Sequence, residues 1–386
     1  MEISAMPHHN TVFRDVLKLV PWHRFEALVE DYEADVRVRR LSTKGQFVAL
    51  LYGQFSGASS LREVVTGLSS HAGRLYHLGA DRVRRSTLSD ANAKRPAEVF
   101  TALLEIMMKQ AGRGLRRKLA ETTYLIDSTS VRLTERSGDW ARFSAGVCGA
   151  KVHVIYDADA DRPIYAAVST ANVNDISAAQ QMPIEPGATY VFDLGYYDYA
   201  WWAELDAAGC RIVTRFKSNT PLMLLKQLPV ANNLGILSDC IGFLPARQAR
   251  SRRNPMQNAV REVRITTDSG TVLRILSNDL HASAEEIADL YRRRWAIELF
   301  FRWIKQTLKI TRFLGTSENA VRIQIAVALI AFLLLRLAQV AQKAIASPIV
   351  FARLIRINLM HRRLIANLLE PQPVLKDHRQ MSLLLC

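Results

Sequence analysis

The sequence predicts an α/β core, with a mixed sheet and flanking helices, that follows a helical N-terminal domain and is interrupted by a mostly β insertion. Three observations lead to this prediction. Apolar residues recur at helical spacing through residues 10–115. Short runs of β-branched and aromatic residues, separated by helical segments, begin near residue 121. Residues 218–282, with four prolines and alternating apolar positions, then separate the last of these strands from a long amphipathic helix.

The bulk composition is that of a globular protein with a basic surface. The chain has 386 residues, which favours two or three domains. Its hydrophobic content of 49% and charged content of 23% are ordinary for a globular chain. The net charge of +15 favours a polyanionic partner, nucleic acid before membrane, although a generically basic protein would have the same charge.

Cysteine spacing and hydropathy indicate a cytoplasmic location without a membrane span. The four cysteines show no CxxC spacing, so we expect reduced thiols: Cys148, Cys210, Cys240 and Cys386. The N-terminus has no basic segment followed by an apolar one, so a secretory signal is not expected. The longest apolar run, residues 325–335, is far shorter than the roughly 20 residues of a membrane span, which predicts a buried core helix.

The expected elements follow in chain order. Val12, Val16 and Val20 lie on one face of a first helix, and Pro96 interrupts a later one. Strands are expected at residues 122–131, 149–156, 163–170, 189–192 and 211–216, and helices at 172–181 and 198–208. Within the insertion, residues 260–266 and 272–276 alternate as strands do. The order from residue 122 is therefore β-β-β-α-β-α-β, with one further helix after the insertion.

The domain boundaries are expected where this pattern changes. Ser283 opens the long helix, with two glutamates in its first turn, as the helix dipole prefers. The resulting parts are a helical N-terminal domain at 1–118, the first part of the α/β core at 119–217, the insertion at 218–282, the long helix that completes the core at 283–317 and a helical C-terminal region at 318–386.

Three alternating aspartates at residues 157–161 resemble a calcium loop. The sixth position is Arg162 and the twelfth is Val168, where a calcium loop has glycine and glutamate. We therefore expect a hairpin turn between two strands.

The long helix carries four polar residues on one edge of its apolar face. Tyr291, Arg294, Glu298 and Lys305 are spaced by 3, 4 and 7 residues and fall within an arc of roughly 60° on a helical wheel. Side chains at the edge of a core are held in place and still reach solvent, which suits a ligand. For Arg294 and Glu298 alone, a solvated ion pair would be an equally good interpretation.

Two aspartates lie on the predicted strands before this helix. Asp127 is flanked by strand residues, and an aspartate within a buried sheet is costly unless it is paired or binds metal. Asp193 ends an apolar strand, at the edge where α/β sheets place ligands. Turn formation by Asp127 with Ser128 is the alternative. Together with Glu298, the two aspartates could hold two Mg²⁺ ions for phosphoryl transfer.

These residues and their order resemble the DDE transposases, whose catalytic domain has the ribonuclease-H-like fold. More narrowly, the helix matches the Y-x2-R-x3-E-x6-K signature of the insertion-sequence-four group at all four positions. Residues 86–95, 193–197 and 215–217 resemble further family motifs, as does the insertion before Glu298. The resemblance covers nearly the whole chain.

The resemblance implies a function and a set of site residues. Asp127, Asp193 and Glu298 would hold two Mg²⁺ ions, for which Mn²⁺ can substitute, during strand cleavage and strand transfer at the ends of an insertion sequence. The DNA-binding residues would be Tyr291, Arg294, Lys305, Arg302, Arg215 and Lys217. The partners would be double-stranded DNA, as terminal repeats and as target, and a second copy in a homodimer on DNA. The location would be cytoplasmic and nucleoid-associated, in a prokaryote.

Several nearby residues have open interpretations. Lys151 and His153 share one strand face and either approach the metal site or have no chemical role. Asn174 and Asp175 are better explained as helix caps than as ligands. The insertion has Phe243 but no Trp or Tyr, so no residue is assigned to stacking on a flipped base in a DNA hairpin, and a hairpin intermediate stays open.

Two other classes of protein fit part of the pattern. A catalytically inactive DNA-binding regulator derived from a transposase would need the basic surface but not the three acids. A recombinase with a covalent nucleophile, such as Ser128 or Tyr196, would leave a protein–DNA adduct and would work in EDTA. No matching arginine–histidine set surrounds those two residues in the sequence, which disfavours the second alternative.

Overall fold

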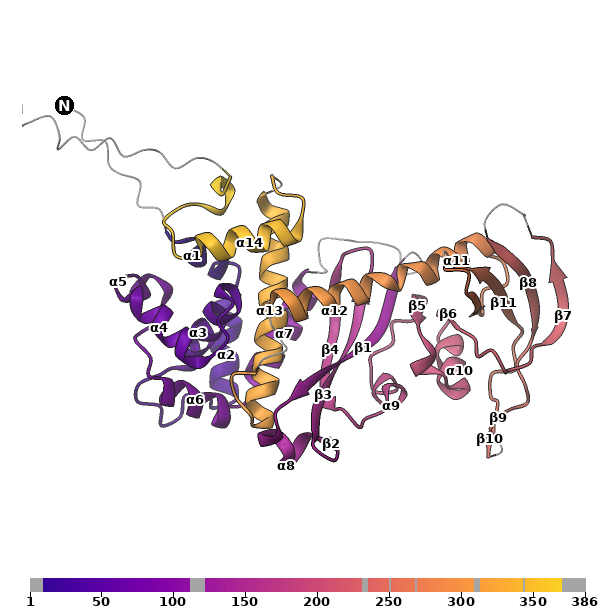
Figure 1. The fold of residues 1–386 in the computed structure, drawn as a ribbon, viewed down its shortest axis with the longest axis horizontal. Coiled ribbons are helices and arrows are strands. Elements are labelled where there is room, and N and C mark those ends of the chain that lie inside the picture. The colour runs from indigo at the N-terminus through magenta and orange to yellow at the C-terminus, as the bar shows by residue number, and fades with distance from the viewer. Residues whose placement is uncertain are drawn as a thin grey trace, which may run out of the picture.

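A computed structural model describes residues 10–111, 122–230, 235–249, 251–267, 269–308, 313–342 and 344–369. A ten-stranded mixed sheet runs along the molecule, with a group of helices at one end and further helices packed on its faces (Figure 1). The expected boundary between residues 118 and 119, and the fourth cysteine at position 386, lie outside the described residues.

The N-terminal part is helical, as the sequence predicts. Its α-helices are α1 (Val12–Leu17), α2 (Trp22–Asp31), α3 (Thr43–Ser56), α4 (Leu61–Ser70), α5 (Ala72–Leu75), α6 (Arg85–Lys94) and α7 (Glu98–Ala111). Ser42 and Ser60 cap α3 and α4, because each side chain accepts a hydrogen bond from the backbone N–H three residues later. Pro96 lies between α6 and α7, where it cannot continue the first of them.

The five strands that the sequence predicts form one half of the sheet. They are β1 (Thr123–Leu133), β3 (Val147–Asp157), β4 (Arg162–Thr170), β5 (Thr189–Phe192) and β6 (Arg211–Arg215). Their spatial order is β4-β3-β1-β5-β6; β3 is antiparallel to β1 and β4, and β5 is parallel to β1 and β6. This arrangement confirms the ribonuclease-H-like mixed sheet. A short strand, β2 (Arg142–Ser144), pairs with β3 and has no counterpart in the sequence prediction.

The insertion lengthens the same sheet. Its strands are β7 (Met223–Leu228), β8 (Ile236–Phe243), β9 (Arg247–Ala249), β10 (Arg252–Arg253), β11 (Val260–Thr266) and β12 (Val272–Ser277). Because β12 pairs with β6, the sheet continues in the order β6-β12-β11-β8-β7, while β9 and β10 form a separate pair. The mostly β character is confirmed, and the domain boundaries stay predictions.

The long helix is made of two segments, α11 (Ala284–Arg293) and α12 (Trp295–Thr307). The expectation of one uninterrupted helix is therefore wrong at Arg294. Here the backbone N–H of Arg294 bonds to Tyr291 and that of Ile297 bonds to Arg294, three residues apart instead of four. Arg294 keeps helical dihedral angles, so α12 continues nearly in line with α11 (Figure 1).

Side chains alternate along β1 between two hydrophobic cores. Leu125 and Val131 face the core shared with α12, whereas Tyr124 and Ile126 face the core shared with α10 (Tyr199–Ala207). Odd-numbered residues of β1 therefore point toward α12. A short helix, α9 (Asp175–Ala179), packs on the same face as α10, since Ala179 belongs to the second core.

The helix α13 (Glu318–Gln342) runs between the N-terminal helices and the sheet (Figure 1). It packs against α3, α6 and α7, and against α14 (Pro348–Asn358). Among the described residues it is the single helix long and apolar enough to cross a membrane by length and composition, yet most of its apolar window is buried. The expected core helix at residues 325–335 is thus confirmed.

Candidate active site

Asp127 lies in the middle of β1, at the point where the parallel pairing with β5 has ended. That pairing covers residues 123–125 only, so the edge of β1 beside Asp127 is open on this side. Asp127 is odd-numbered and therefore faces α12. The backbone N–H of Ser128 donates to Asp127 Oδ1 at 2.7 Å, which fixes the carboxylate. Its side chain is 19% exposed, so it is held but reachable.

Asp193 directly follows β5, the strand next to β1. Its Oδ1 accepts a hydrogen bond from the backbone N–H of Gly195 at 2.8 Å and so caps a short 3-10 turn. A Cβ at Gly195 would lie 3.1 Å from Asp193 Oδ1 and 3.3 Å from Asp175 Oδ2. A side chain at this position would crowd both carboxylates, which is a physical reason for glycine here.

Glu298 extends from α12 toward β1 and meets Arg294. Arg294 Nη2 lies 2.6 Å from Glu298 Oε1, and Arg294 Nη1 lies 3.7 Å from Asp127 Oδ2. One guanidinium therefore bridges a strand carboxylate and a helix carboxylate. The ion pair that the sequence left as an alternative exists, but it also includes Asp127.

The charges of the other two acids act on Asp127. Burial raises the pKa of Asp127 to about 6, against the lowering effect of the Ser128 N–H bond. The charges of Asp193 and Glu298 raise this pKa further, while Arg294 lowers it. A carboxyl whose neighbours oppose its ionisation is a position that a cation would stabilise.

A shallow cavity of about 390 Å³ opens beside Asp127 and Glu298, and Arg302 and Lys305 line it as well. Burial lowers the pKa of Lys305, and the charge of Asp127 opposes that shift. The cavity therefore brings together two carboxylates and two cationic side chains.

The remaining predicted residues surround this group at different distances. The Tyr291 ring lies 5.7 Å from the Arg294 guanidinium carbon, and burial raises the pKa of its hydroxyl, with opposing contributions from Arg294 and Arg215. Arg215 is the last residue of β6, and β6 packs against α11, the helix that carries Tyr291. Lys217 is exposed, and its ammonium lies 4.2 Å from the centre of the Tyr197 ring, on the β6 side of the site.

Asp175 is the functional candidate that the sequence interpretation missed. Its expected role as a helix cap is wrong: Asn174 holds the cap position and makes no side-chain capping bond. Asp175 Oδ1 instead accepts hydrogen bonds from Ser128 Oγ at 2.7 Å and from Lys151 Nζ at 3.2 Å. His153 Nδ1 lies 3.8 Å from the same oxygen.

The alternation of β1 explains this second group. Ser128 faces away from α12, so Asp175, Lys151 and His153 lie on the opposite side of the sheet from Asp127. Lys151 and His153 thus do not line the cavity beside Asp127. His153 is 1% exposed, and burial lowers its pKa, which favours the neutral imidazole. The signal that could have located Asp175 was its position in the segment after β4, beside the end of β5.

The structure disfavours a covalent nucleophile. The side chain of Tyr196 is 1% exposed, and burial together with the charges of Asp127 and Asp175 raises its pKa well above the ordinary value. Such a phenol is neither accessible nor readily ionised. Ser128 lines the cavity, but its hydroxyl hydrogen is donated to Asp175.

The aspartates at residues 157–161 form a hairpin turn between β3 and β4, as expected. Asp159 pairs with Arg293, and Asp161 Oδ2 lies 2.6 Å from Arg336 Nη2. These carboxylates are therefore occupied by arginines. Of the cysteines, Cys148, Cys210 and Cys240 are free thiols.

The donor set of the site suits a hard divalent cation, but its geometry is not that of a closed metal site. Within the described residues, no three Asp, Glu, His or Cys side chains lie close enough together to hold one ion. The guanidinium of Arg294 stands between Asp127 and Glu298 instead. The three acids suit Mg²⁺ because this ion prefers carboxylate oxygens as ligands. Their negative charge also suits a divalent cation.

Comparison with known proteins shows the family of this chain. Residues 118–334 match the family model described as the transposase DDE domain. A putative transposase of Sinorhizobium fredii is 39% identical over 76% of this chain and 82% of its own length. A probable transposase for insertion sequence element IS5377 of Geobacillus stearothermophilus is 29% identical over 75% and 79%. A putative transposase for insertion sequence element IS4SA of Synechocystis is 27% identical over 69% and 75%.

The chain therefore belongs to the DDE transposases. Within that class it is of the insertion-sequence-four type, as its helix signature predicts. Membership implies a general dependence on divalent metal ions and the binding of DNA. Residues 8–81 match a second family model, which is described only as a domain of unknown function.

Proposed function

We propose that Asp127, Asp193 and Glu298 are the catalytic carboxylates of this transposase and that together they hold two Mg²⁺ ions, with Mn²⁺ able to substitute. The observation that carries the proposal is the raised pKa of Asp127, to which the charges of Asp193 and Glu298 both contribute. When bound, such ions would activate the attacking oxygen and stabilise the leaving oxygen in an in-line displacement at phosphorus. The reaction is strand cleavage at the ends of an insertion sequence, followed by strand transfer.

Arg294 has two tasks in this proposal. Without metal, its guanidinium neutralises part of the negative charge of Asp127 and Glu298. Because a guanidinium forms planar two-point contacts with phosphate as readily as with carboxylate, Arg294 can turn to the scissile phosphate once Glu298 engages metal. The Tyr291 ring lies beside this guanidinium, 5.7 Å from its carbon.

The other cationic residues are proposed to hold DNA. Lys305 and Arg302 line the cavity that contains Asp127, so they can contact phosphates beside the scissile bond. Arg215 and Lys217, at the end of β6, would contact the strand on the far side of Asp193.

The proposed partners and location follow from the family. We expect double-stranded DNA, as terminal repeats and target, and a homodimer that pairs two DNA ends. We expect the protein in the cytoplasm of a prokaryote, in association with the nucleoid. An inactive DNA-binding regulator is the alternative, and no feature of the described residues favours it.

The test is cleavage of duplexes that carry the DNA flanking this reading frame. Asp193→Asn and Glu298→Gln should each lower the Mg²⁺-dependent cleavage rate by more than about 100-fold, since even outer partners of metal ligands are worth 10–100-fold. DNA binding in EDTA should stay within about twofold. Glu204→Gln, an isosteric change at an exposed residue of α10, is the matched control and should cleave normally.

Two outcomes would decide against the proposal. If Glu298→Gln cleaved like the wild type, the assignment of the carboxylates would be wrong. If the wild-type protein bound the flanking DNA but failed to cleave it with Mg²⁺ or Mn²⁺, the regulator would be the better description.

A further inference from the structure

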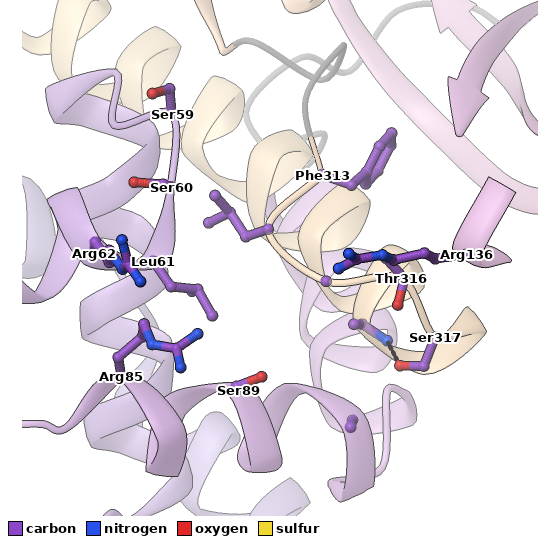
Figure 2. A pocket seen from close by; sticks show the side chains of 14 residues that line it. Ser59, Ser60, Leu61, Arg62, Arg85, Ser89, Arg136, Phe313, Thr316 and Ser317 are labelled. Carbon is purple, nitrogen blue, oxygen red and sulfur yellow. Dashed lines mark hydrogen bonds between the residues drawn. The ribbon is translucent and has the colours of Figure 1, made fainter. Parts of the chain in front are cut away.

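A second cavity, of about 630 Å³, lies between the N-terminal helices and the segment that joins α12 to α13. One wall is formed by residues 59–62 at the start of α4 and by Arg85 and Ser89 of α6. The opposite wall is formed by Arg136, just after β1, and by residues 313–317. Figure 2 shows Arg62 and Arg85 on one side of this space and Arg136 on the other.

The cavity is strongly basic. It is lined by three arginines and five hydroxyl-bearing residues, and by no acidic residue. Among the described residues, Arg62, Arg85 and Arg136 have no carboxylate within ion-pair distance, in contrast to many other arginines of the chain. Three unpaired guanidiniums that surround one space repel each other unless an anion lies between them.

The two acids that directly follow the lining residues Arg62 and Ser317 in the chain make other contacts. Glu63 bonds back to the N–H and hydroxyl of Ser59 at 2.8 and 2.6 Å, so its charge serves the capping of α4. Glu318 pairs with Arg322 at 2.6 Å. These two carboxylates therefore have partners other than the three arginines of the cavity.

The two walls are fixed relative to each other. Asn319, at the start of α13, bonds to the carbonyl oxygens of Asn92 and Arg95 at the end of α6, at 3.0 and 2.5 Å. The carbonyl oxygen of Thr316 accepts from Ser137 Oγ at 2.9 Å and from the Trp140 indole at 3.0 Å. A ligand would thus meet a preformed site and would not have to order these segments.

Arg136 of the cavity follows β1, the strand that carries Asp127. From Asp127, β1 continues for six residues to Leu133, and Arg136 follows shortly after. Six strand residues span about 20 Å. Along one strand of duplex DNA the same length corresponds to roughly six base pairs. A single duplex can therefore reach both the carboxylates and the cavity.

We propose that this cavity binds the phosphodiester backbone of the DNA duplex whose end lies at the active site, about six base pairs inside the cleavage point. The proposal rests on the proposed function for the placement of that end. It also gives a role to the segment matched as a domain of unknown function, because residues 59–62 lie within residues 8–81. Arginine contacts to phosphate position a duplex without reading its sequence.

The first test is the salt dependence of binding to flanking duplexes, measured in EDTA so that cleavage plays no part. The triple variant Arg62→Gln, Arg85→Gln, Arg136→Gln should lower the slope of log affinity against log salt by about 2–3, since each phosphate contact contributes about 0.9. Affinity should fall about 10-fold or more at low salt, equally for random and flanking sequence. Unfolding temperature should not change, because the three arginines are exposed.

A matched control separates this site from the general loss of positive charge. Arg24, Arg353 and Arg362 are also exposed, lack a carboxylate partner among the described residues and do not line the cavity. Their triple glutamine variant should change the slope by less than 1. If both triple variants behaved alike, the proposal would fail, whatever the outcome for Glu298→Gln. As a second variant, Ser89→Glu adds an acid to the cavity wall and should also weaken binding.

The second test locates the contact on the DNA. A neutral methylphosphonate placed about six base pairs inside the cleavage point should weaken binding of the wild type but not of the cavity triple variant. A methylphosphonate at the cleavage point should weaken both proteins equally. If the inner substitution weakened both proteins equally as well, the cavity would not be the site of that contact. Cleavage tests of the carboxylates remain independent of this result.

Discussion

At the scale of single residues, Asp175 supports Asp127 from the opposite face of the sheet. The backbone N–H of Ser128 holds the Asp127 carboxylate, and the Ser128 hydroxyl is in turn held by Asp175. Lys151 compensates the charge of Asp175 at 3.2 Å. Asp175 thus acts through Ser128 and touches neither the cavity nor Arg294, which makes it a positioning residue.

Replacing Asp175 should therefore lower activity without lowering DNA affinity. We expect Asp175→Ala to reduce the cleavage rate about 10- to 100-fold, in the range of outer partners of metal sites, and to raise the Mg²⁺ concentration for half-maximal rate. Asp175→Asn should recover part of the rate, since its amide oxygen can still accept from Ser128. Cleavage kinetics over a Mg²⁺ titration measure both. An unchanged Mg²⁺ requirement in Asp175→Ala would show that the residue does not support the site.

The residues that sequence reasoning could place relative to one another are those with a fixed spacing on one element. Helical periodicity was enough to bring Glu298 and Lys305 of α12 to one edge together with Arg294, the residue just before it, because helical dihedral angles relate them by local geometry alone. Asp175 could not be found in this way. Asp175 lies on α9, whereas its partners Ser128 and Lys151 lie on β1 and β3. Only the register of β1 against β3 brings these two partners together.

At the scale of elements, the insertion is held by a charged network inside the sheet. Glu262 of β11 accepts from Arg274 of β12 at 2.7 Å and from Arg264 at 2.6 Å, and its side chain is 3% exposed. Burial alone would raise the pKa of Glu262, but these hydrogen bonds outweigh it and the pKa is lowered. Breaking a buried pair of this kind costs about 3–5 kcal/mol.

This network should make the insertion sensitive to acid. A carboxyl with a lowered folded pKa contributes stability above its unfolded pKa of about 4.3 and loses it as the pH falls through the folded value. We expect the free energy of unfolding to decrease below about pH 4.3, and Glu262→Gln to remove this part of the pH dependence while costing about 3 kcal/mol at pH 7. Urea unfolding between pH 7 and 3 measures this. Glu98→Gln, at an exposed residue, is the control and should keep the wild-type slope.

The elements themselves were predictable where their pattern was strong. The strands β5 and β11 begin and end where alternation and β-branched residues predict. The break at Arg294 was not predictable, because no glycine or proline marks it. The short strand β2 depends on pairing with β3, and its three residues carry no periodicity of their own.

At the scale of the whole molecule, one hydrophobic core joins the parts that the sequence divides. Residues of the N-terminal helices, β1, α12 and α13 belong to a single buried cluster. Composition marks where the chain changes from helix to strand, but it does not show which apolar faces pack together. The domain boundaries near residues 118 and 318 therefore remain predictions. The parts on either side of them pack into one hydrophobic core.

A change in the middle of α13 should weaken the N-terminal helices and the sheet at once. Ile330 is fully buried, so Ile330→Ala should cost about 2–5 kcal/mol. Val340→Ala, on the same helix at 68% exposure, should cost less than about 0.5 kcal/mol. Urea unfolding, followed by far-ultraviolet circular dichroism and by tryptophan fluorescence, should give one coincident transition in each variant. Separate transitions would contradict the shared core.

The pairing of β12 with β6 has a consequence for how such proteins diversify. The chain leaves the core after β6 and returns along β12, and Asn278 fastens the return by accepting from the backbone N–H of Ile212 at 2.7 Å. The insertion thus starts and ends on two neighbouring strands, whatever its length. We expect evolution, or a protein engineer, to be able to shorten, lengthen or exchange the outer strands β7, β8 and β11 without moving Glu298.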